Sequence, residues 1–292
     1  MQPRQSAFLL SVLSFGLAFL YVPIAMLIIY SFNHSTLVPV WGGFSTRWYE
    51  VLFESEDVWS ALLLSLNIAL INATFATLLG ALAGLSLTRI RRFKGQTLFA
   101  GMITAPLVIP EVITGLSLLL LFITLGNWIG WPNERGITTI TIAHITFSMA
   151  YVAIIVRARL AGMGEDLEEA AQDLGSNPLR VMIDITIPLL APALLAGWLL
   201  AFTLSLDDLI IASFVSGPGS NTLPMLIYSR VRLGLRPDIN ALATIIILVV
   251  AFGVFIAGWL LIRQQRRRQR DMTVPDSQPK TSSFGVTVSR RW

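Results

Sequence analysis

Six long apolar runs constrain the fold of this chain more than any other feature of its sequence. A helix needs about 20 apolar residues to cross a hydrocarbon core of about 30 Å, and each run reaches that length. The runs extend over Phe8–Tyr30, Val58–Leu87, Leu98–Leu125, Ile137–Val156, Leu189–Phe214 and Ile239–Ile262. Because unpaired backbone polar groups are costly in lipid, such segments span the membrane as helices. The sequence therefore predicts an all-α integral membrane protein with six transmembrane helices.

Composition excludes several other classes of protein. Only 13% of the residues are charged and 54% are hydrophobic, whereas soluble domains carry about 25% charged residues. The chain has no cysteine, which excludes disulfides, thiolate metal sites and a catalytic Cys. The chain has only two histidines, which argues against a histidine-based metal centre. We therefore predict neither catalytic nor metal-ligating residues. The net charge of +4 comes from loops and the C-terminal tail, so it does not indicate nucleic-acid binding.

The distribution of Lys and Arg predicts the orientation of the helices. With the N-terminus in the cytoplasm, sixteen of the 21 basic residues fall in cytoplasmic segments, as the positive-inside rule requires. Both termini are therefore expected in the cytoplasm. The first run is too long for a cleaved signal peptide and no small-residue cleavage site follows it, so we expect it to be retained.

The loop between the fourth and fifth runs predicts an amphipathic helix on the cytoplasmic side. Leu167, Ala170, Ala171 and Leu174 follow the i, i+3, i+4, i+7 spacing of one helix face. This spacing predicts a short helix over residues 164–174. The apolar face of such a helix fits a groove on a soluble partner, and the alternative is a solvated loop helix without a partner.

Turn residues then predict a second short helix. Gly175 suits the left-handed position after a helix end, and Asn177 and Pro178 suit the N-cap and first position of the next helix. Pro188 and Pro192 mark the return of the chain into the membrane. The loop is therefore expected to form a helix–turn–helix.

The stretch EAAQDLGSNPLRVMIDITIP resembles the EAA signature of ABC importer permeases. The matching positions are Glu169, Ala170, Ala171, Gly175, Ile185, Ile187 and Pro188, with Ile187 standing where Leu is usual. The resemblance implies that the two short helices form a coupling element that seats in a cytoplasmic ATPase. It further implies that the coupling residues are Glu169, Ala170, Ala171, Gly175 and Pro178.

ATP hydrolysis is expected to belong to that partner. A phosphate-binding P-loop needs Gly-Lys within its motif, and this dipeptide never occurs in the chain. The chain is therefore predicted not to be an enzyme and to hold no cofactor, with ATP and Mg²⁺ bound by the partner ATPase.

The resemblance extends over nearly the whole chain, from about Phe8 to Ile262. FNHSTLVPVWGGFSTRWY, TAPLVIPEVITGLSLLLLF and GWLLAFTLSLDDLIIASFVSGPGSNTLPM together resemble the putrescine/spermidine branch of these permeases, and look closest to a permease subunit of the putrescine importer. The implied partners are a second homologous permease in a heterodimer, an ABC ATPase dimer and a periplasmic polyamine-binding protein. The implied location is the bacterial inner membrane.

We divide the chain into three parts on this basis. Residues 1–57 are expected to form an N-terminal helix and an outer loop, and residues 58–262 a type-1 ABC permease core. Residues 263–292 are expected to form a basic cytoplasmic tail. Its positive charges either only keep the C-terminus in the cytoplasm or also contact anionic lipid. After about Asp271 the tail lacks any period and is predicted to be disordered.

The charges inside the apolar runs suit a cationic cargo. Glu111, Asp207 and Asp208 are the acids there, and no Lys or Arg accompanies them. Carboxylates attract the ammonium ends of a polyamine in a low-dielectric gap. Ser205 and Asp208 share a helix face at i, i+3, so we expect Asp208 to face the substrate path and Asp207 to cap or pin backbone.

Glu111 follows two prolines, Pro106 and Pro110, which are expected to kink or break the third run. Counted along a continuous helix it lies about 20 Å from the inner end. An opened backbone there would place Glu111 in the path with Asp207, Asp208 and Ser205. The alternatives for Glu111 are pairing with a partner subunit and protonation.

Other features have structural interpretations. His144 is expected to form an interhelical hydrogen bond rather than a site, and Gly80 and Gly84 fit the spacing of closely packed helices. Residues 223–232 are expected to form a short outer helix, in a gate or in a plain connecting loop. Trp41, Trp48, Tyr49 and Trp59 fit an aromatic belt, with docking of a binding protein as the alternative.

Three rival functions remain open at this point. The first is an ABC permease for another cargo, such as ferric ion or sulfate. The second is a proton-coupled secondary transporter, which would need an internal inverted repeat that the sequence does not show. The third is a membrane enzyme, for which no nucleophile–base cluster is found.

Overall fold

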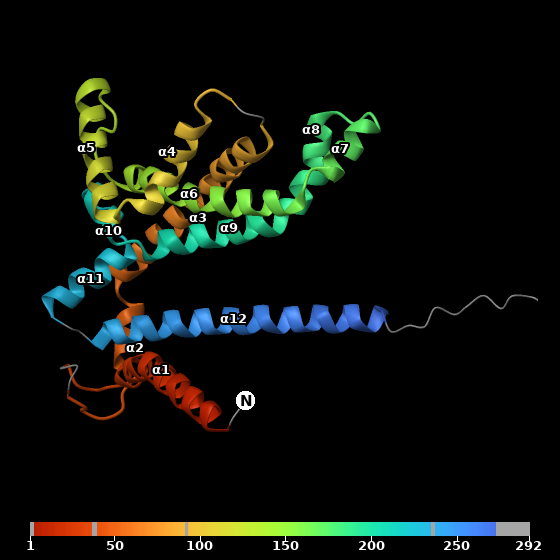
Figure 1. Cartoon of the computed structure of the whole chain (residues 1–292). Coiled ribbons are helices and arrows are strands. Elements are labelled where there is room, and N and C mark those ends of the chain that lie inside the picture. The colour runs from red at the N-terminus through yellow and green to blue at the C-terminus, as the bar shows by residue number, and fades with distance from the viewer. Residues whose placement is uncertain (1–2, 37–39, 91–92, 235–236, 273–292) are drawn as a thin grey trace, which may run out of the picture. The chain divides into compact units, whose positions relative to one another are not determined.

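The computed structural model describes residues 3–36, 40–90, 93–234 and 237–272, and these are almost entirely helical (Figure 1). Within those ranges six helical segments are long and apolar enough to cross a membrane. They are Phe8–Tyr30, Glu56–Arg89, Glu111–Ile129, Ile137–Met163, Pro178–Asp207 and Pro237–Ile256. The predicted all-α fold with six spans is confirmed.

The chain divides into two compact units. One unit runs from Ile29 to Ile239, and the other holds most of α1 (Pro3–Tyr30) and α12 (Pro237–Met272). In α12 the helix continues past the predicted end at Ile262, and the Arg263 guanidinium lies 3.5 Å from the centre of the Trp259 ring. The tail that was predicted to be disordered lies almost wholly outside the described residues.

The centre of the larger unit is built from α3 (Glu56–Arg89), α6 (Ile137–Met163) and α9 (Ile187–Asp207). Two glycines of α3 let it approach α6 closely. A Cβ at Gly80 would lie 2.7 Å from the Met149 carbonyl oxygen, and one at Gly84 would lie 2.9 Å from a Val156 methyl carbon. The prediction of close packing from the Gly80/Gly84 spacing is therefore confirmed.

A buried amide joins the same three helices. Asn72 of α3 donates from Nδ2 to the Ser148 hydroxyl at 3.2 Å and to the Ala201 carbonyl at 2.8 Å. These partners belong to α6 and α9, and all three residues are buried. In an apolar interior such bonds oppose sliding of one helix past another, because sliding would leave polar groups unpaired.

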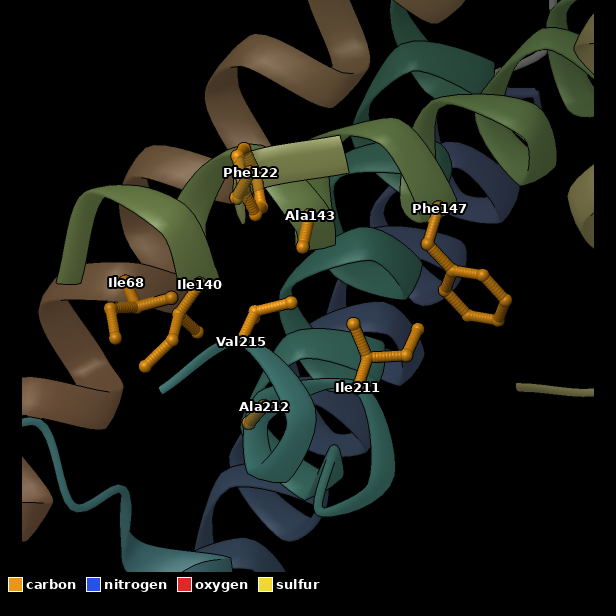
Figure 2. Close-up of a cluster of buried hydrophobic side chains, with 8 residues drawn as sticks. All are labelled: Ile68, Phe122, Ile140, Ala143, Phe147, Ile211, Ala212 and Val215. Atoms are coloured by element: carbon orange, nitrogen blue, oxygen red, sulfur yellow. The ribbon is translucent and has the colours of Figure 1, made fainter. Parts of the chain in front are cut away.

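A second cluster packs beside this centre, around α5 (Glu111–Ile129) and α10 (Ile210–Val215). An added Cβ at Gly115 of α5 would lie 2.8 Å from the Phe214 ring, so the two helices touch closely. Figure 2 shows the buried apolar side chains that α3, α5, α6 and α10 contribute there. They are Ile68, Phe122, Ile140, Ala143, Phe147, Ile211, Ala212 and Val215.

The third predicted run is not a single helix. It forms α4 (Gln96–Val108) and then α5, with Ile109 extended at φ −79°, ψ 131°. Pro110 causes this break, because proline has no N–H for the helix and pushes the preceding residue out of the helical region. The 13 residues of α4 reach only about 20 Å. The predicted break at the prolines is confirmed, and the depth of Glu111 in the membrane stays a prediction.

The fifth predicted run differs at both ends. α8 (Pro178–Val181), the π-helix η1 (Met182–Thr186) and α9 follow one another without a break, so the second short helix is the beginning of the span. Pro188 lies in the first turn of α9, where a missing N–H is tolerated. At the other end α9 stops at Asp207 instead of continuing to Phe214.

The segment before α3 contains a short helix, α2 (Arg47–Phe53), and its Trp48 is not a belt residue. Trp48 is buried and its Nε1 donates to the Asn33 carbonyl at 2.7 Å. The belt interpretation was wrong for Trp48, whose indole N–H has a buried backbone partner. α11 (Leu223–Leu233) confirms the predicted short helix there, and α6 extends seven residues past its predicted end at Val156.

Candidate functional site

The first candidate site is the break between α9 and α10. Asp208 is extended at φ −67°, ψ 120°, and it caps the next helix with its side chain. Its Oδ1 accepts from the Ile211 N–H at 3.3 Å and its Oδ2 from the Ala212 N–H at 2.7 Å. A carboxylate at a helix N-terminus satisfies amides that have no helical partner.

His144 of α6 joins this break to the centre of the unit. Its Nε2 lies 3.0 Å from Asp208 Oδ2, and its Nδ1 lies 2.7 Å from the Ser205 hydroxyl. The side chains of His144 and Asp208 are 3% and 9% exposed, and Ser205 is buried. The prediction that His144 makes an interhelical hydrogen bond is confirmed. Its link to Asp208 was missed, although a lone histidine and an acid in two spans are a signal for pairing.

The two adjacent carboxylates have opposite environments. Asp208 accepts from two backbone amides and contacts the His144 ring, whereas Asp207, the last residue of α9, is exposed. We expected Asp207 to be the capping member, and this was wrong. The reason is that the helix ends between the two residues, so the i, i+3 relation of Ser205 and Asp208 does not describe a continuous helix face. Contact of Asp208 with a substrate stays a prediction.

Glu111 lies at the other break. It is the first residue of α5, directly after Pro110, and its side chain is exposed. One turn further, Gly115 packs against α10, and Figure 1 shows α10 beside the first turns of α5. The two interrupted spans thus meet at the α5–α10 contact. Arg135 donates to the backbone carbonyl of Phe214, the residue whose ring packs on Gly115.

The second candidate site is α7 (Asp166–Asp173) with the turn that follows it. Gly175 has φ +86°, its N–H donates to the Gln172 carbonyl at 2.8 Å, and the Ser176 N–H donates to the Ala171 carbonyl at 3.1 Å. This pair of bonds is a Schellman motif. Asn177 then accepts from the Leu179 N–H at 3.2 Å and caps α8. The predicted helix, turn and caps are confirmed.

The predicted coupling residues lie on the outside of this element. Glu169, Ala170, Gly175 and Pro178 are exposed and Ala171 is half-buried. No residue of α7 is buried, and its Leu167 is exposed. The element therefore presents a mixed apolar and acidic surface that the described chain does not cover.

Comparisons with known proteins bear on both sites. Residues 76–270 match the family model for the binding-protein-dependent transport system inner membrane component. The putrescine transport system permease protein PotI of Escherichia coli is 56% identical over 89% of this chain and 93% of its own length. The spermidine/putrescine transport system permease protein PotC of the same organism is 40% identical over 86% and 92%.

Solved structures of ABC importers share the fold. A bacterial ABC transporter that imports the acidic polysaccharide alginate matches with a TM-score of 0.68 at 16% identity, over 90% of this chain and 98% of the other. The methionine transporter MetNI in an inward-facing conformation matches with a TM-score of 0.55 at 15% identity, over 76% and 99%.

These relatives are transport permeases and not enzymes, which removes the membrane enzyme from the alternatives. The six apolar spans agree with a multi-pass inner-membrane protein. The match at residues 76–270 includes the Asp207/Asp208 break and all of α7. The chain therefore belongs to the family of binding-protein-dependent transport system inner membrane components, the permease subunits of ABC importers.

Proposed function

We propose that this chain forms half of the translocation path of an ATP-driven importer for polyamines, with putrescine as the main cargo. The supporting relatives are named as putrescine and spermidine/putrescine permeases. The charges of the chain agree with such a cargo, because the apolar runs of its sequence contain acids without Lys or Arg. A dication attracts carboxylates, whereas sulfate would need basic groups or helix N-termini.

One observation supports the roles that we assign to the two adjacent aspartates in the substrate path. Asp208 is held by two amides and His144, while Asp207, beside it, is exposed at the end of α9. Asp207 is therefore the carboxylate that meets an ammonium group of the cargo. Glu111, exposed at the start of α5, is a second carboxylate for the other end of the dication. Asp208 and Ser205 hold the break in shape.

The proposed complex contains three further components. A second permease completes the path, a periplasmic protein delivers the polyamine, and a cytoplasmic ATPase dimer binds ATP and Mg²⁺. α7 and the turn at Gly175 dock on the ATPase through Glu169, Ala170, Ala171 and Pro178. The N-terminus and the basic tail face the cytoplasm, in agreement with the distribution of Lys and Arg.

Uptake of labelled putrescine in cells lacking other polyamine importers tests the path. Asp207→Asn should reduce uptake at low putrescine concentration by about tenfold or more, because a charge-assisted contact is lost. Much of the loss should appear as a raised KM. Glu111→Gln should act in the same direction, and Glu134→Gln is the control, since Glu134 is an exposed acid between α5 and α6.

Two outcomes would contradict the polyamine proposal. Normal putrescine uptake in Asp207→Asn and Glu111→Gln would exclude these carboxylates from the path. Transport of sulfate or ferric ion by the wild-type importer, with no polyamine uptake, would assign another cargo.

Docking is tested separately by Glu169→Lys. The substitution reverses a charge on the exposed face of α7, so the ATPase should no longer co-purify with the permease, or ATP hydrolysis should no longer drive uptake. Lys94→Glu reverses an exposed charge in the loop between α3 and α4, outside α7 and α8, and serves as the control. Intact assembly and uptake in Glu169→Lys would argue against docking through this face.

A further inference from the structure

The side chain of Arg89 connects the end of α3 to α7. Its Nη1 lies 3.2 Å from Glu165 Oε1 and its Nε lies 3.0 Å from Glu168 Oε2. Nη2 also donates to the Gly164 carbonyl. Arg89 is the last residue of α3 and only 16% exposed, so one guanidinium holds the start of α7 through three different residues.

Glu168 continues this connection to a third element. Its other carboxylate oxygen, Oε1, accepts from the Thr186 hydroxyl at 2.9 Å. Thr186 is buried and is the last residue of the π-helix η1, which leads directly into α9. The Glu168 side chain is 15% exposed. Arg89, Glu165, Glu168 and Thr186, here called the polar clamp, thus join α3, α7 and η1.

Apolar packing gives α7 little other support. No residue of α7 is buried. A cavity of about 450 Å³ lies beside the polar clamp, between α7, the end of α3 and the start of the α8–η1 segment. Its lining includes Arg89, Glu168, Glu169 and Thr186. Since a cavity replaces side-chain packing at this place, charged and polar contacts determine where α7 sits.

The two glutamates at the centre of α7 both line this cavity but differ in their contacts and exposure. Glu168 contacts Arg89 and Thr186, while Glu169 is exposed. Adjacent residues therefore differ in role: Glu168 makes contacts within the chain, and Glu169 presents its carboxylate to solvent. A force on the outer side of α7 reaches α3 and α9 through Glu168.

We propose that Arg89 and Glu168 are positioning residues that transmit movement of α7 to α3 and, through Thr186, to α9. This inference rests on the proposed docking of α7 on the ATPase. Without the polar clamp the importer assembles and hydrolyses ATP, but movement of the ATPase is absorbed by rotation of α7. The spans that carry the substrate path then move less for each ATP hydrolysed.

The test uses the whole importer, reconstituted in lipid vesicles with its ATPase, partner permease and binding protein. Arg89→Gln and Glu168→Gln should each lower putrescine transported per ATP hydrolysed by at least about fivefold. The amount of assembled complex and the rate of ATP hydrolysis should stay within about twofold of wild type. A purely structural role would instead reduce the amount of complex and leave this ratio unchanged.

Further variants separate the polar clamp from a general effect of charge. The loss in the double variant Arg89→Gln/Glu168→Gln should be smaller than the sum of the two single losses, because both substitutions remove the shared Arg89–Glu168 contact. Thr186→Val removes the hydroxyl at nearly constant shape and should lower the ratio by a smaller factor. Arg89→Lys keeps the charge without the guanidinium fork and should restore part of the ratio. Lys94→Gln removes an exposed charge from the loop that follows Arg89 and α3, and it is the matched control.

The outcomes distinguish this inference from the proposed docking. Suppose that Arg89→Gln transports as much putrescine per ATP as wild type, while Glu169→Lys loses coupling. This result would overturn the polar clamp alone. An unchanged ratio in both variants would overturn the docking of α7 and the clamp with it. Fully additive losses in the double variant would show that the Arg89–Glu168 contact transmits nothing, which also contradicts the clamp.

Discussion

His144 makes a contact through each of its two ring nitrogens. In the tautomer with Nε2–H donating to the Asp208 carboxylate, Nδ1 accepts a hydrogen bond from the Ser205 hydroxyl. Asp208 then receives three donors in all. The ring therefore stabilises an extended residue in the middle of an apolar segment, where a break would otherwise leave polar groups unpaired.

Removal of this ring should destabilise the fold. His144→Ala leaves the buried Ser205 and the half-buried Asp208 without their common partner, at a cost of about 1–3 kcal/mol. Ser205→Ala removes only one neutral bond and should cost about 0.5–1.5 kcal/mol. Thermal unfolding of the purified permease in detergent measures both.

The other histidine of the chain provides the control. His34 is exposed, so His34→Ala should leave the unfolding temperature unchanged. Equal stability of His144→Ala and His34→Ala would show that the buried contacts of His144 are not needed for folding.

Among the elements, the contact of α3 with α6 depends on two missing side chains. Gly80→Val would place a Cβ 2.7 Å from both the Met149 carbonyl oxygen and Val152 Cβ, so the helices must separate. Overpacking of this kind costs about 1–3 kcal/mol. The same substitution at Gly101 of α4, where no atom lies within 4 Å of the added carbon, is the control.

Detergent-solubilised yield and unfolding temperature measure this effect. Gly80→Val should lower both relative to wild type, and Gly101→Val should lower neither. A stable Gly80→Val variant would mean that α3 and α6 pack less closely than described.

The turn after α7 depends on a left-handed residue. Gly175 at φ +86° is open on all sides, so a side chain meets no atoms but strains the backbone. Asn tolerates this conformation and Val does not. We expect Gly175→Asn to keep most putrescine uptake and Gly175→Val to lose it, with immunoblotting to confirm equal amounts of protein. Equal uptake by the two variants would show that the turn geometry is not required.

The two helix breaks show how far the sequence predicts elements. Pro110 predicts the first break, because proline lacks the N–H that a helix needs and favours an extended conformation of the preceding residue. The second break, at Asp208, has only a weak local signal, since an Asp can accept from the first amides of a helix. Its other partner, His144, lies more than 60 residues earlier in the chain. The π-helix η1 has no local signal, and its Thr186 is held by Glu168 of another element.

At the scale of the whole molecule, the orientation of the chain in the membrane can be tested because it has no native cysteine. Lys94→Cys lies between α4 and the preceding span, and Glu134→Cys lies between α5 and α6. A membrane-impermeant maleimide should label Glu134→Cys in intact spheroplasts and Lys94→Cys only after permeabilisation. The reverse pattern would place the N-terminus outside.

The outline of the molecule was predictable, and its internal connections were not. Apolar runs predicted all six spans, and turn residues predicted α7 and its caps, because both depend on neighbours in the sequence. The roles of Asp207 and Asp208, and the contacts of Arg89, depend on residues far apart in the chain. Such contacts follow from packing, which periodicity and motif spacing do not encode.

The bend of the fifth span at η1 has a mechanical consequence. Figure 1 shows the chain turn between α8 and α9, and α9 then continues for 21 residues to Asp207. A helix of that length is about 31 Å long, and it can tilt about the bend at η1. A tilt of about 5° displaces the far end by about 3 Å, the length of one hydrogen bond. A small rotation beside the polar clamp would therefore move Asp207 far enough to make or break the contact with an ammonium group that we propose for it.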